Sequence, residues 1–249
     1  MFSKRREFIF SVGVLLLASF TVSAAPFQAG QIFIAYGSNN VGVFADTVSL
    51  KGTSVQKLSI SPSGFTTSSA SLAGGGVALD EFGNLYVTVQ YLSGTNQNRG
   101  IIKFNRDGSI AWRADSRGSL DYRGIVASAS LDRVFVATEG GRGASGIHVY
   151  RASNGEKIAE FGGTLAYRDL ALDGKGNLYA LRHNEVRFWS AGNFSGLGTS
   201  LFTIPQEEPR AIVADEDGNI YISFERTKVV RKYSSKGTLL ATYLTPGGV

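Results

Sequence analysis

Three arginines recur at one position of a repeated pattern, and arginine is well suited to hold an anion. They stand two residues before a short apolar segment, in the tetrapeptides YRGI (Arg123), YRDL (Arg168) and PRAI (Arg210). A guanidinium can bind a carboxylate or phosphate through two parallel hydrogen bonds. If the apolar segments line one channel, the arginines would ring its mouth and attract an anion or an acidic partner. The alternative is structural: each arginine ties neighbouring units together through carbonyls or through acids such as Asp121 and Asp169.

A second set of polar residues recurs farther along each repeat, six positions past the first residue of a predicted second strand. Its members are Gln90, Glu139, His183 and Glu225. By the same geometry, these strand ends point to the face that carries the arginines. Glu139, His183 and Glu225 could coordinate a divalent cation or act as acid and base. The alternative is that they are ordinary polar residues where strands leave the core. Both sets are binding candidates, and no residue is assigned as catalytic or as a metal ligand.

Other chemistry-bearing motifs are weak. Residues 215–219 (DEDGN) place oxygen atoms at alternate positions, as a calcium loop begins. A tight hairpin lacks the distal acid that completes such a loop, and the sister turns carry Phe82 and Lys175 in place of Asp217. These residues therefore predict a β-turn. The sequence has no Ser-His-Asp set, P-loop or dinucleotide fingerprint, so it predicts no cofactor.

These candidates are positioned by four copies of one pattern. The copies start at Val77, Ile125, Leu170 and Ile212, with steps of 48, 45 and 42 residues. A period of 40 to 50 residues built from short strands is typical of a β-propeller with one blade per repeat. The last copy is the clearest, with strands predicted over 211–215, 219–224, 228–234 and 238–244 joined by turns that contain Gly. The sequence therefore predicts an all-β propeller of four-stranded antiparallel blades.

A fifth, partial repeat precedes these four. Residues 32–35, 41–44 and 55–60 match a second, third and fourth strand, but the repeat lacks a first strand of its own. The chain ends at 245–249 (TPGGV), which resembles the start of a first strand at 74–77. Either this tail completes a closed five-bladed ring, or the chain is an incomplete six-bladed form. Residues 61–73 are expected to form a Ser/Thr-rich loop, and residues 90–99 and 139–146 long loops between second and third strands.

The repeats resemble the NHL-repeat propellers and the related regucalcin and gluconolactonase-like group. The resemblance rests on GVALD at 76–80 with GNLYV at 83–87, and it recurs at 170–179 and 212–221. It covers nearly the whole chain after the first 24 residues and implies the fold far more than an activity. The regucalcin-like lactonases hold a divalent metal with acids and an Asn on inner strands, and no matching set occurs in this chain. Asp80, Asp173 and Asp215 are instead expected to bond backbone N–H groups of their turns.

The first residues predict export. Lys4, Arg5 and Arg6 precede an apolar run at 9–22, and Val22-Ser23-Ala24 offers small residues for cleavage after Ala24. The run is shorter than the roughly 20 residues that span a bilayer, so an uncleaved anchor is the lesser alternative. Residues 5–9 (RREFI) also resemble a twin-arginine signal, which leaves the general and the twin-arginine export routes open and indicates a bacterial source. Residues 25–249 then form a single propeller domain.

Composition limits the function further. The chain has no cysteine, so an exported form must be stabilised by its core alone. The net charge falls from +5 to +3 when Lys4, Arg5, Arg6 and Glu7 are removed, and no basic block for nucleic acid remains. Aromatic residues at regular strand positions are expected to pack between blades, and His148 to face outward from its strand. The sequence thus predicts a periplasmic or secreted, non-catalytic binding scaffold for an unknown protein or an anionic small ligand, with no stable membrane insertion. The alternative is a metal-dependent hydrolase or lyase of the gluconolactonase-like type.

Overall fold

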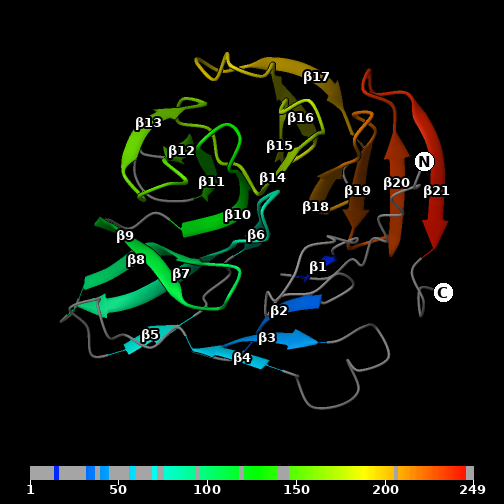
Figure 1. Cartoon of the computed structure of the whole chain (residues 1–249). Helices are drawn as coiled ribbons and strands as arrows, with labels where there is room; N and C mark the ends of the chain where they lie inside the picture. The colour runs from blue at the N-terminus through cyan, green and yellow to red at the C-terminus, as the bar shows by residue number, and fades with distance from the viewer. Residues whose placement is uncertain are drawn as a thin grey trace, which may run out of the picture.

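The computed structural model describes residues 76–93, 96–117, 121–139, 146–204 and 207–244, together with five short strands nearer the N-terminus. The described residues form strands and turns without a helix, and none of them forms a helix that could cross a membrane. The strands make five antiparallel sheets, which we call blades 1 to 5 in chain order. Figure 1 shows the blades placed around a common centre, with β6, β10, β14 and β18 nearest to it. The chain is a β-propeller, as the repeat predicted.

Four of the five blades have four strands, which pair in sequence order, whereas in five-stranded blade 2 both β5 and β6 pair with β7. Blade 1 contains β1 (Val14–Leu16), β2 (Ile32–Tyr36), β3 (Asn40–Phe44) and β4 (Gln56–Ser59). Blade 2 contains β5 (Ser69–Ser71), β6 (Val77–Leu79), β7 (Leu85–Ser93), β8 (Asn96–Phe104) and β9 (Ile110–Arg117). Blade 3 contains β10 (Asp121–Ser128), β11 (Arg133–Glu139), β12 (Gly146–Tyr150) and β13 (Lys157–Phe161). Blade 4 contains β14 (Asp169–Leu172), β15 (Leu178–Arg182), β16 (Glu185–Trp189) and β17 (Thr199–Thr203), and blade 5 contains β18 (Pro209–Ala214), β19 (Ile220–Phe224), β20 (Val229–Tyr233) and β21 (Leu239–Leu244).

The core lies between successive blades, because the aromatic residue of the second strand is buried against the next blade in blades 2, 3 and 4. Tyr86 packs with Ile125 and Val134 of blade 3, and Phe135 packs with Leu170 and Leu178 of blade 4. Tyr179 is buried in the same way against blade 5. The equivalent residue of blade 5, Tyr221, is only half-buried. The recurring aromatics are therefore core residues, as predicted.

The first two blades differ from the sequence prediction. β1 pairs with β2, so blade 1 has an inner strand from within the chain's first 24 residues. This strand corrects the expectation that blade 1 lacks a first strand of its own, whereas export and cleavage after Ala24 stay a prediction. β5 pairs with β7 inside the segment expected to be a loop, and β7 and β8 form a long hairpin where a loop was expected at 90–99. The C-terminal tail at 245–249 and most of the loop predicted at 139–146 lie outside the described residues.

His148 faces inward, which corrects the expected outward orientation. Its side chain is buried, the Tyr122 ring packs edge-on against it, and the Tyr122 hydroxyl lies 3.4 Å from Nδ1. Every residue of β12 is buried, so this strand has no outward face and alternation does not apply to it. Burial lowers the pKa of His148 to about 4, and the nearby Lys157 charge acts in the same direction. The imidazole is therefore neutral over the physiological pH range.

Candidate functional site

The three arginines stand at the N-terminal ends of consecutive inner strands, and we call this side of the molecule the arginine face. In blades 3 and 5 the strand register shifts at the arginine itself, between Tyr122 and Ile125 and between Pro209 and Ala211. Such a bulge leaves one residue unpaired and redirects its side chain. In blade 4 the Arg168 N–H donates to the Leu181 carbonyl, and Gly124 N–H of blade 3 donates to the Arg168 carbonyl. The backbone thus places an arginine at the same end of all three inner strands.

Arg123 of blade 3 is neutralised by its neighbours. Its Nε lies 2.9 Å from Glu139 Oε2, and its Nη2 lies 3.6 Å from Asp121 Oδ2. Asp121 in turn pairs with the buried Arg99 of blade 2. The four residues form a chain of alternating charge that joins blades 2 and 3. This is the structural role that the sequence offered as the alternative.

Arg210 of blade 5 is neutralised in a similar way. It pairs with Glu225, which follows the second strand β19, and its Nη2 lies 3.8 Å from Glu208 Oε2. All three side chains are exposed, so the pairing contributes little to stability. It nevertheless places two negative charges beside the guanidinium. Arg210 is therefore expected to attract an anion less strongly than an unpaired arginine at the same position would.

Arg168 of blade 4 differs from the other two. Its Nη1 donates a hydrogen bond of 3.0 Å to the Pro209 carbonyl of blade 5, and it forms no ion pair within the described part of the chain. The reason is the second strand, because His183 occupies the position that Glu139 and Glu225 hold in their blades. His183 is exposed in a tight turn with a positive φ of 37°. Arg168 therefore keeps its charge and most of its donors for another acceptor.

Asp169, the residue after Arg168, has a role other than the ion pair with an arginine that the sequence suggested. Its Oδ2 accepts a 2.9 Å hydrogen bond from the Ile212 N–H of blade 5. On the other side it lies against Gly124 of blade 3, where a Cβ would overlap Oδ1. Burial between blades raises the pKa of Asp169 to about 7, although the Ile212 and Leu170 N–H bonds lower it. Comparison of the repeats could have found this residue, because Gly76, Gly124 and Ala211 stand at its position elsewhere.

A second guanidinium stands near Arg168 at the end of β15. Arg182 follows Leu181, whose carbonyl accepts the Arg168 N–H. Its Nη1 lies 3.4 Å from Glu185 Oε2, but its buried Nε has no hydrogen-bond partner. Glu185 also pairs with Arg187 at 3.1 Å. Two arginines, Arg182 and Arg187, thus share the Glu185 carboxylate, which leaves an excess of positive charge on blade 4.

The second predicted set does not converge. Glu139 and Glu225 each bind the arginine of their own blade, and His183 stands alone on blade 4. No three acids or histidines among the described residues form a group that could hold a metal ion. Gln90 lies on β7 opposite Arg99 in the register, and its side chain is outside the described residues. These residues lie at the same end of the second strands, but they do not come together at a single binding site.

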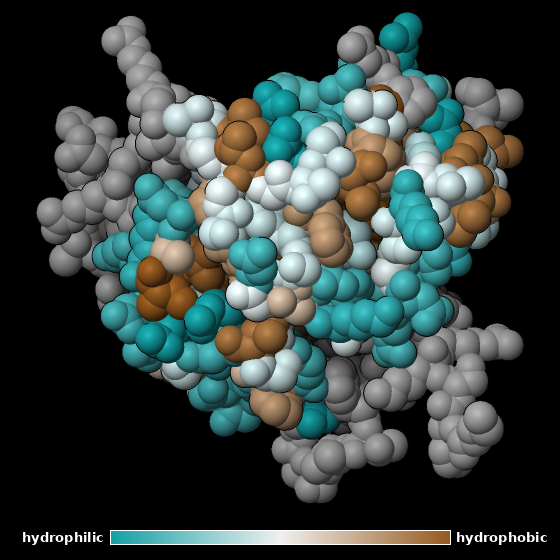
Figure 2. Space-filling view, turned by 90° about the horizontal axis from the view of Figure 1, so that it is seen from above, coloured by the Kyte–Doolittle hydropathy of each residue, from teal (hydrophilic) through white to brown (hydrophobic). Residues whose placement is uncertain are grey.

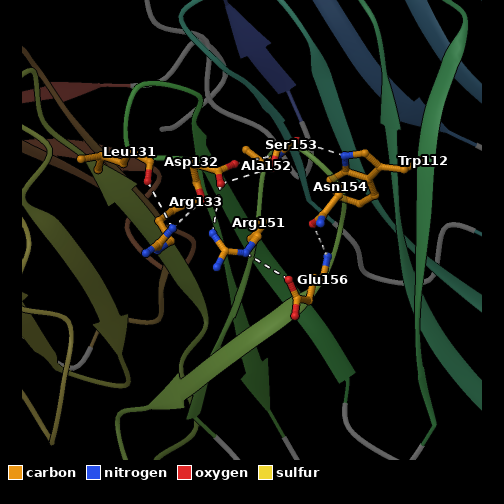
Figure 3. Close-up of polar contacts among 9 residues, drawn as sticks. All are labelled: Trp112, Leu131, Asp132, Arg133, Arg151, Ala152, Ser153, Asn154 and Glu156. Carbon is orange, nitrogen blue, oxygen red and sulfur yellow. Dashed lines mark hydrogen bonds and ion pairs between the residues drawn. The ribbon is translucent and has the colours of Figure 1, made fainter.

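The opposite side of the molecule uses its polar groups for its own turns. Asp215 Oδ1 accepts from the Asp217 and Asn219 N–H groups, and Oδ2 accepts from Asn219 Nδ2. Asp80 and Asp173 make the same bonds, which confirms the turn role predicted for all three. Figure 3 shows another such cluster: Asp132 accepts from Ser153 N–H at 2.7 Å, and Arg151 pairs with Glu156 at 3.0 Å. These groups are occupied by structural bonds, so the arginine face is the better candidate.

Known proteins resemble this chain in fold. No protein-family model matches it, and no curated protein matches it in sequence. Among solved structures, a Bacteroides caccae protein of unknown function has a TM-score of 0.58 at 14% identity, over 87% of this chain and 74% of that one. A calcium-binding regucalcin from Agrobacterium tumefaciens has a TM-score of 0.46 at 15% identity, over 71% of this chain and 76% of that one. The first of these likenesses supports the fold alone.

Proposed function

We propose that this chain is an exported, non-catalytic propeller that binds a carboxylate-bearing ligand or protein segment at the blade 4 sector of its arginine face. One observation carries the proposal: Arg168 has no acidic partner within the described residues, whereas Arg123 and Arg210 have theirs. The repeated motifs elsewhere are used by turns and by the core. Membership of the NHL type is part of the same proposal, and it rests on the repeated Asp, Gly, Asn and Tyr residues.

The geometry favours a carboxylate because Arg168 is already oriented. Its bond to the Pro209 carbonyl fixes one Nη1 donor between blades 4 and 5, so less side-chain freedom is lost when an anion binds. Charge-assisted hydrogen bonds from guanidinium to carboxylate are about twice as strong as neutral ones. A planar, acidic group is therefore the chemistry that this sector would recognise.

The test is binding of a fluorescent oligoglutamate peptide, measured by anisotropy at low salt. We expect Arg168→Gln to weaken binding about tenfold, the effect of losing a charged hydrogen bond. Arg210→Gln is the matched control, because it removes the same group from an already neutralised position, and it should change binding less than twofold. Absence of binding to the unaltered protein, or equal effects of the two variants, would refute the proposal. Thermal unfolding of both variants verifies that the fold is retained.

Export is tested separately by the mass of the protein recovered from a bacterial periplasm. A chain that begins at Ala25 supports export and cleavage, whereas a chain that retains residues 1–24 contradicts them. Cleavage would also remove β1, which pairs with β2 through Val14, Leu15 and Leu16. Comparing the unfolding of the two forms then measures what this strand contributes to blade 1.

A further inference from the structure

The positive charge of Arg168 is the property on which the proposed binding depends. Figure 2 shows the hydrophobic side chains on one side of the molecule in separate groups among hydrophilic ones, so this side offers a ligand no single continuous apolar patch. Arg168 has no acidic partner within the described residues, and its charge remains available to an anion. Any group that neutralises Arg168 should therefore weaken binding.

Asp169, the next residue along the chain, is held against the same short segment of blade 5 as Arg168. Arg168 Nη1 donates to the Pro209 carbonyl at 3.0 Å, and Asp169 Oδ2 accepts from the Ile212 N–H at 2.9 Å. These two backbone atoms of β18 are less than about 10 Å apart, because each residue of an extended strand adds about 3.3 Å. Charges at such separations interact in water of physiological salt, and more strongly where protein surrounds them.

The surroundings of Asp169 favour its neutral form. Its Oδ1 lies against Gly124 of blade 3, and its Oδ2 lies against blade 5. Burial between the blades raises the pKa of Asp169 to about 7, although the Ile212 and Leu170 N–H bonds lower it. The residue as a whole is half-buried, so its proton can exchange with solvent. Asp169 therefore gains or loses its charge near neutral pH without unfolding of the blades.

The other charged groups on the strands around β14 already have partners. The acids at these strand ends each pair with an arginine: Asp121 and Glu139 with Arg123, and Glu208 and Glu225 with Arg210. Arg182, at the end of β15, pairs with Glu185. His183 is the remaining titratable residue there, in the turn after β15. An ionised Asp169 would therefore neutralise Arg168 before any of the other arginines.

We propose that the protonation of Asp169 regulates this site, so that Arg168 binds an anion while Asp169 is neutral and loses the anion when Asp169 ionises. This inference rests on the function proposed above. Glu139 beside Arg123 and Glu225 beside Arg210 show the effect of a permanent acid on this face. Asp169 is an acid that carries its charge only at the upper end of the pH range. The site accordingly binds its ligand at mildly acidic pH and releases it at mildly alkaline pH.

The test is anisotropy of the fluorescent oligoglutamate peptide with the full chain at pH 6 and pH 8, where the glutamate side chains are ionised throughout. The neutral fraction of Asp169 falls from about nine tenths to about one tenth between these pH values. Since the apparent Kd varies inversely with the binding-competent fraction, we expect it to be about five to nine times higher at pH 8. Asp169→Asn, which stays neutral, should bind as tightly at pH 8 as at pH 6.

The controls separate Asp169 from its neighbours. Histidine side chains also titrate near neutral pH, so the comparison is repeated in His183→Asn, which should keep the pH dependence. Asp169→Ala, which places the residue of blade 5 at this position, is a second variant in case Asp169→Asn does not fold, and thermal unfolding at both pH values verifies the fold.

Two kinds of failure are distinguishable. Binding that does not change with pH, a pH dependence that survives in the Asp169 variants, or one that disappears in His183→Asn overturns the role of Asp169 and leaves the proposed function standing. Absence of peptide binding at both pH values overturns the proposed function and this inference together.

Discussion

Blades 4 and 5 carry the same arginine at the same position and use it differently. Arg210 of blade 5 is enclosed by Glu225 and Glu208, whereas Arg168 of blade 4 reaches across to the Pro209 carbonyl of blade 5. The difference comes from the residue that follows the second strand, which is Glu225 in blade 5 and His183 in blade 4. The position in the repeat thus determines where an arginine lies. The residue beside that arginine determines whether the positive charge remains available to a ligand. Blade 3, with Arg123 and Glu139, follows blade 5.

Blade 4 also differs from its neighbours at the start of its inner strand. Asp169 takes a position that is glycine in blades 2 and 3 and alanine in blade 5. Its carboxyl group contacts blade 3 at Gly124 and blade 5 at Ile212, so one side chain joins three blades. The availability of Arg168 and the enclosure of Asp169 therefore occur together. The sector with the candidate site therefore departs from the repeat at two positions, Asp169 and His183.

The largest effect is expected from Gly124→Ala, which breaks the fit between blades 3 and 4. A Cβ at residue 124 would lie 2.6 Å from Asp169 Cα and 2.9 Å from Leu170 N. Backbone atoms cannot yield as a side chain can, so we expect a loss of about 2–3 kcal/mol in the free energy of unfolding, measured in urea. Gly192→Ala is the control: its Cβ meets nothing within 4 Å, and only its φ of 80° is strained. Equal losses in the two variants would contradict this account.

The next effect concerns pH and the enclosure of Asp169. Its pKa of about 7 in the folded protein lies above the ordinary value of 3.8, so the folded state keeps a proton that the unfolded chain loses. This contribution to stability is complete below pH 4 and is lost as the pH rises toward 7. Asp169→Asn, which keeps an acceptor for the Ile212 N–H, should therefore lose less stability than the unaltered chain between pH 5 and pH 8. Urea unfolding at both pH values measures the difference, and parallel changes would show that Asp169 ionises normally.

The smallest effect sharpens the comparison of blades 4 and 5 directly. His183→Asp gives Arg168 an acidic neighbour, as Glu225 is to Arg210, and should weaken oligoglutamate binding a few-fold. His183→Asn is the control, because Asn and Asp both tolerate a positive φ and differ mainly in charge. The reverse change, Glu225→Gln, should strengthen binding by releasing Arg210. Anisotropy titrations measure all three, and equal affinities of the Asp and Asn variants would disprove the role of the second-strand residue.

The sequence predicted those parts of the fold that repeat. The turn residues Asp80, Asp173 and Asp215 and the packing residues Tyr86 and Tyr179 have the roles expected of them. The errors fall where the repeat is interrupted: β1 supplies the first strand that blade 1 was expected to lack, and β5 is a strand in a segment expected to be a loop. His148 was misplaced because alternation assumes a strand with one exposed face, and β12 has none.

The sequence predicted where the candidate arginines lie, but it did not predict which of them lacks an acidic partner. Aligning the repeats identified Arg123, Arg168 and Arg210 as one set, and the structure places all three at the starts of inner strands. It did not separate Arg168 from the other two, since that depends on which acids come within reach. Nor did it single out Asp169. The pKa of this residue is raised because its carboxyl group is buried between residues of blade 3 and blade 5, which the sequence alone does not bring together.

By itself, the sequence determined the propeller fold, most of its strands and turns, and which residues lie on the arginine face. These features depend on neighbours within one repeat. The tertiary structure alone decided which of those residues remains available to a ligand. Arg168 bonds a carbonyl 41 residues away and Asp169 an N–H 43 residues away, one repeat farther along the chain. These contacts depend on how one blade packs on the next. A charge is neutralised or left available by atoms within a few ångströms, and only the folded ring brings those atoms together.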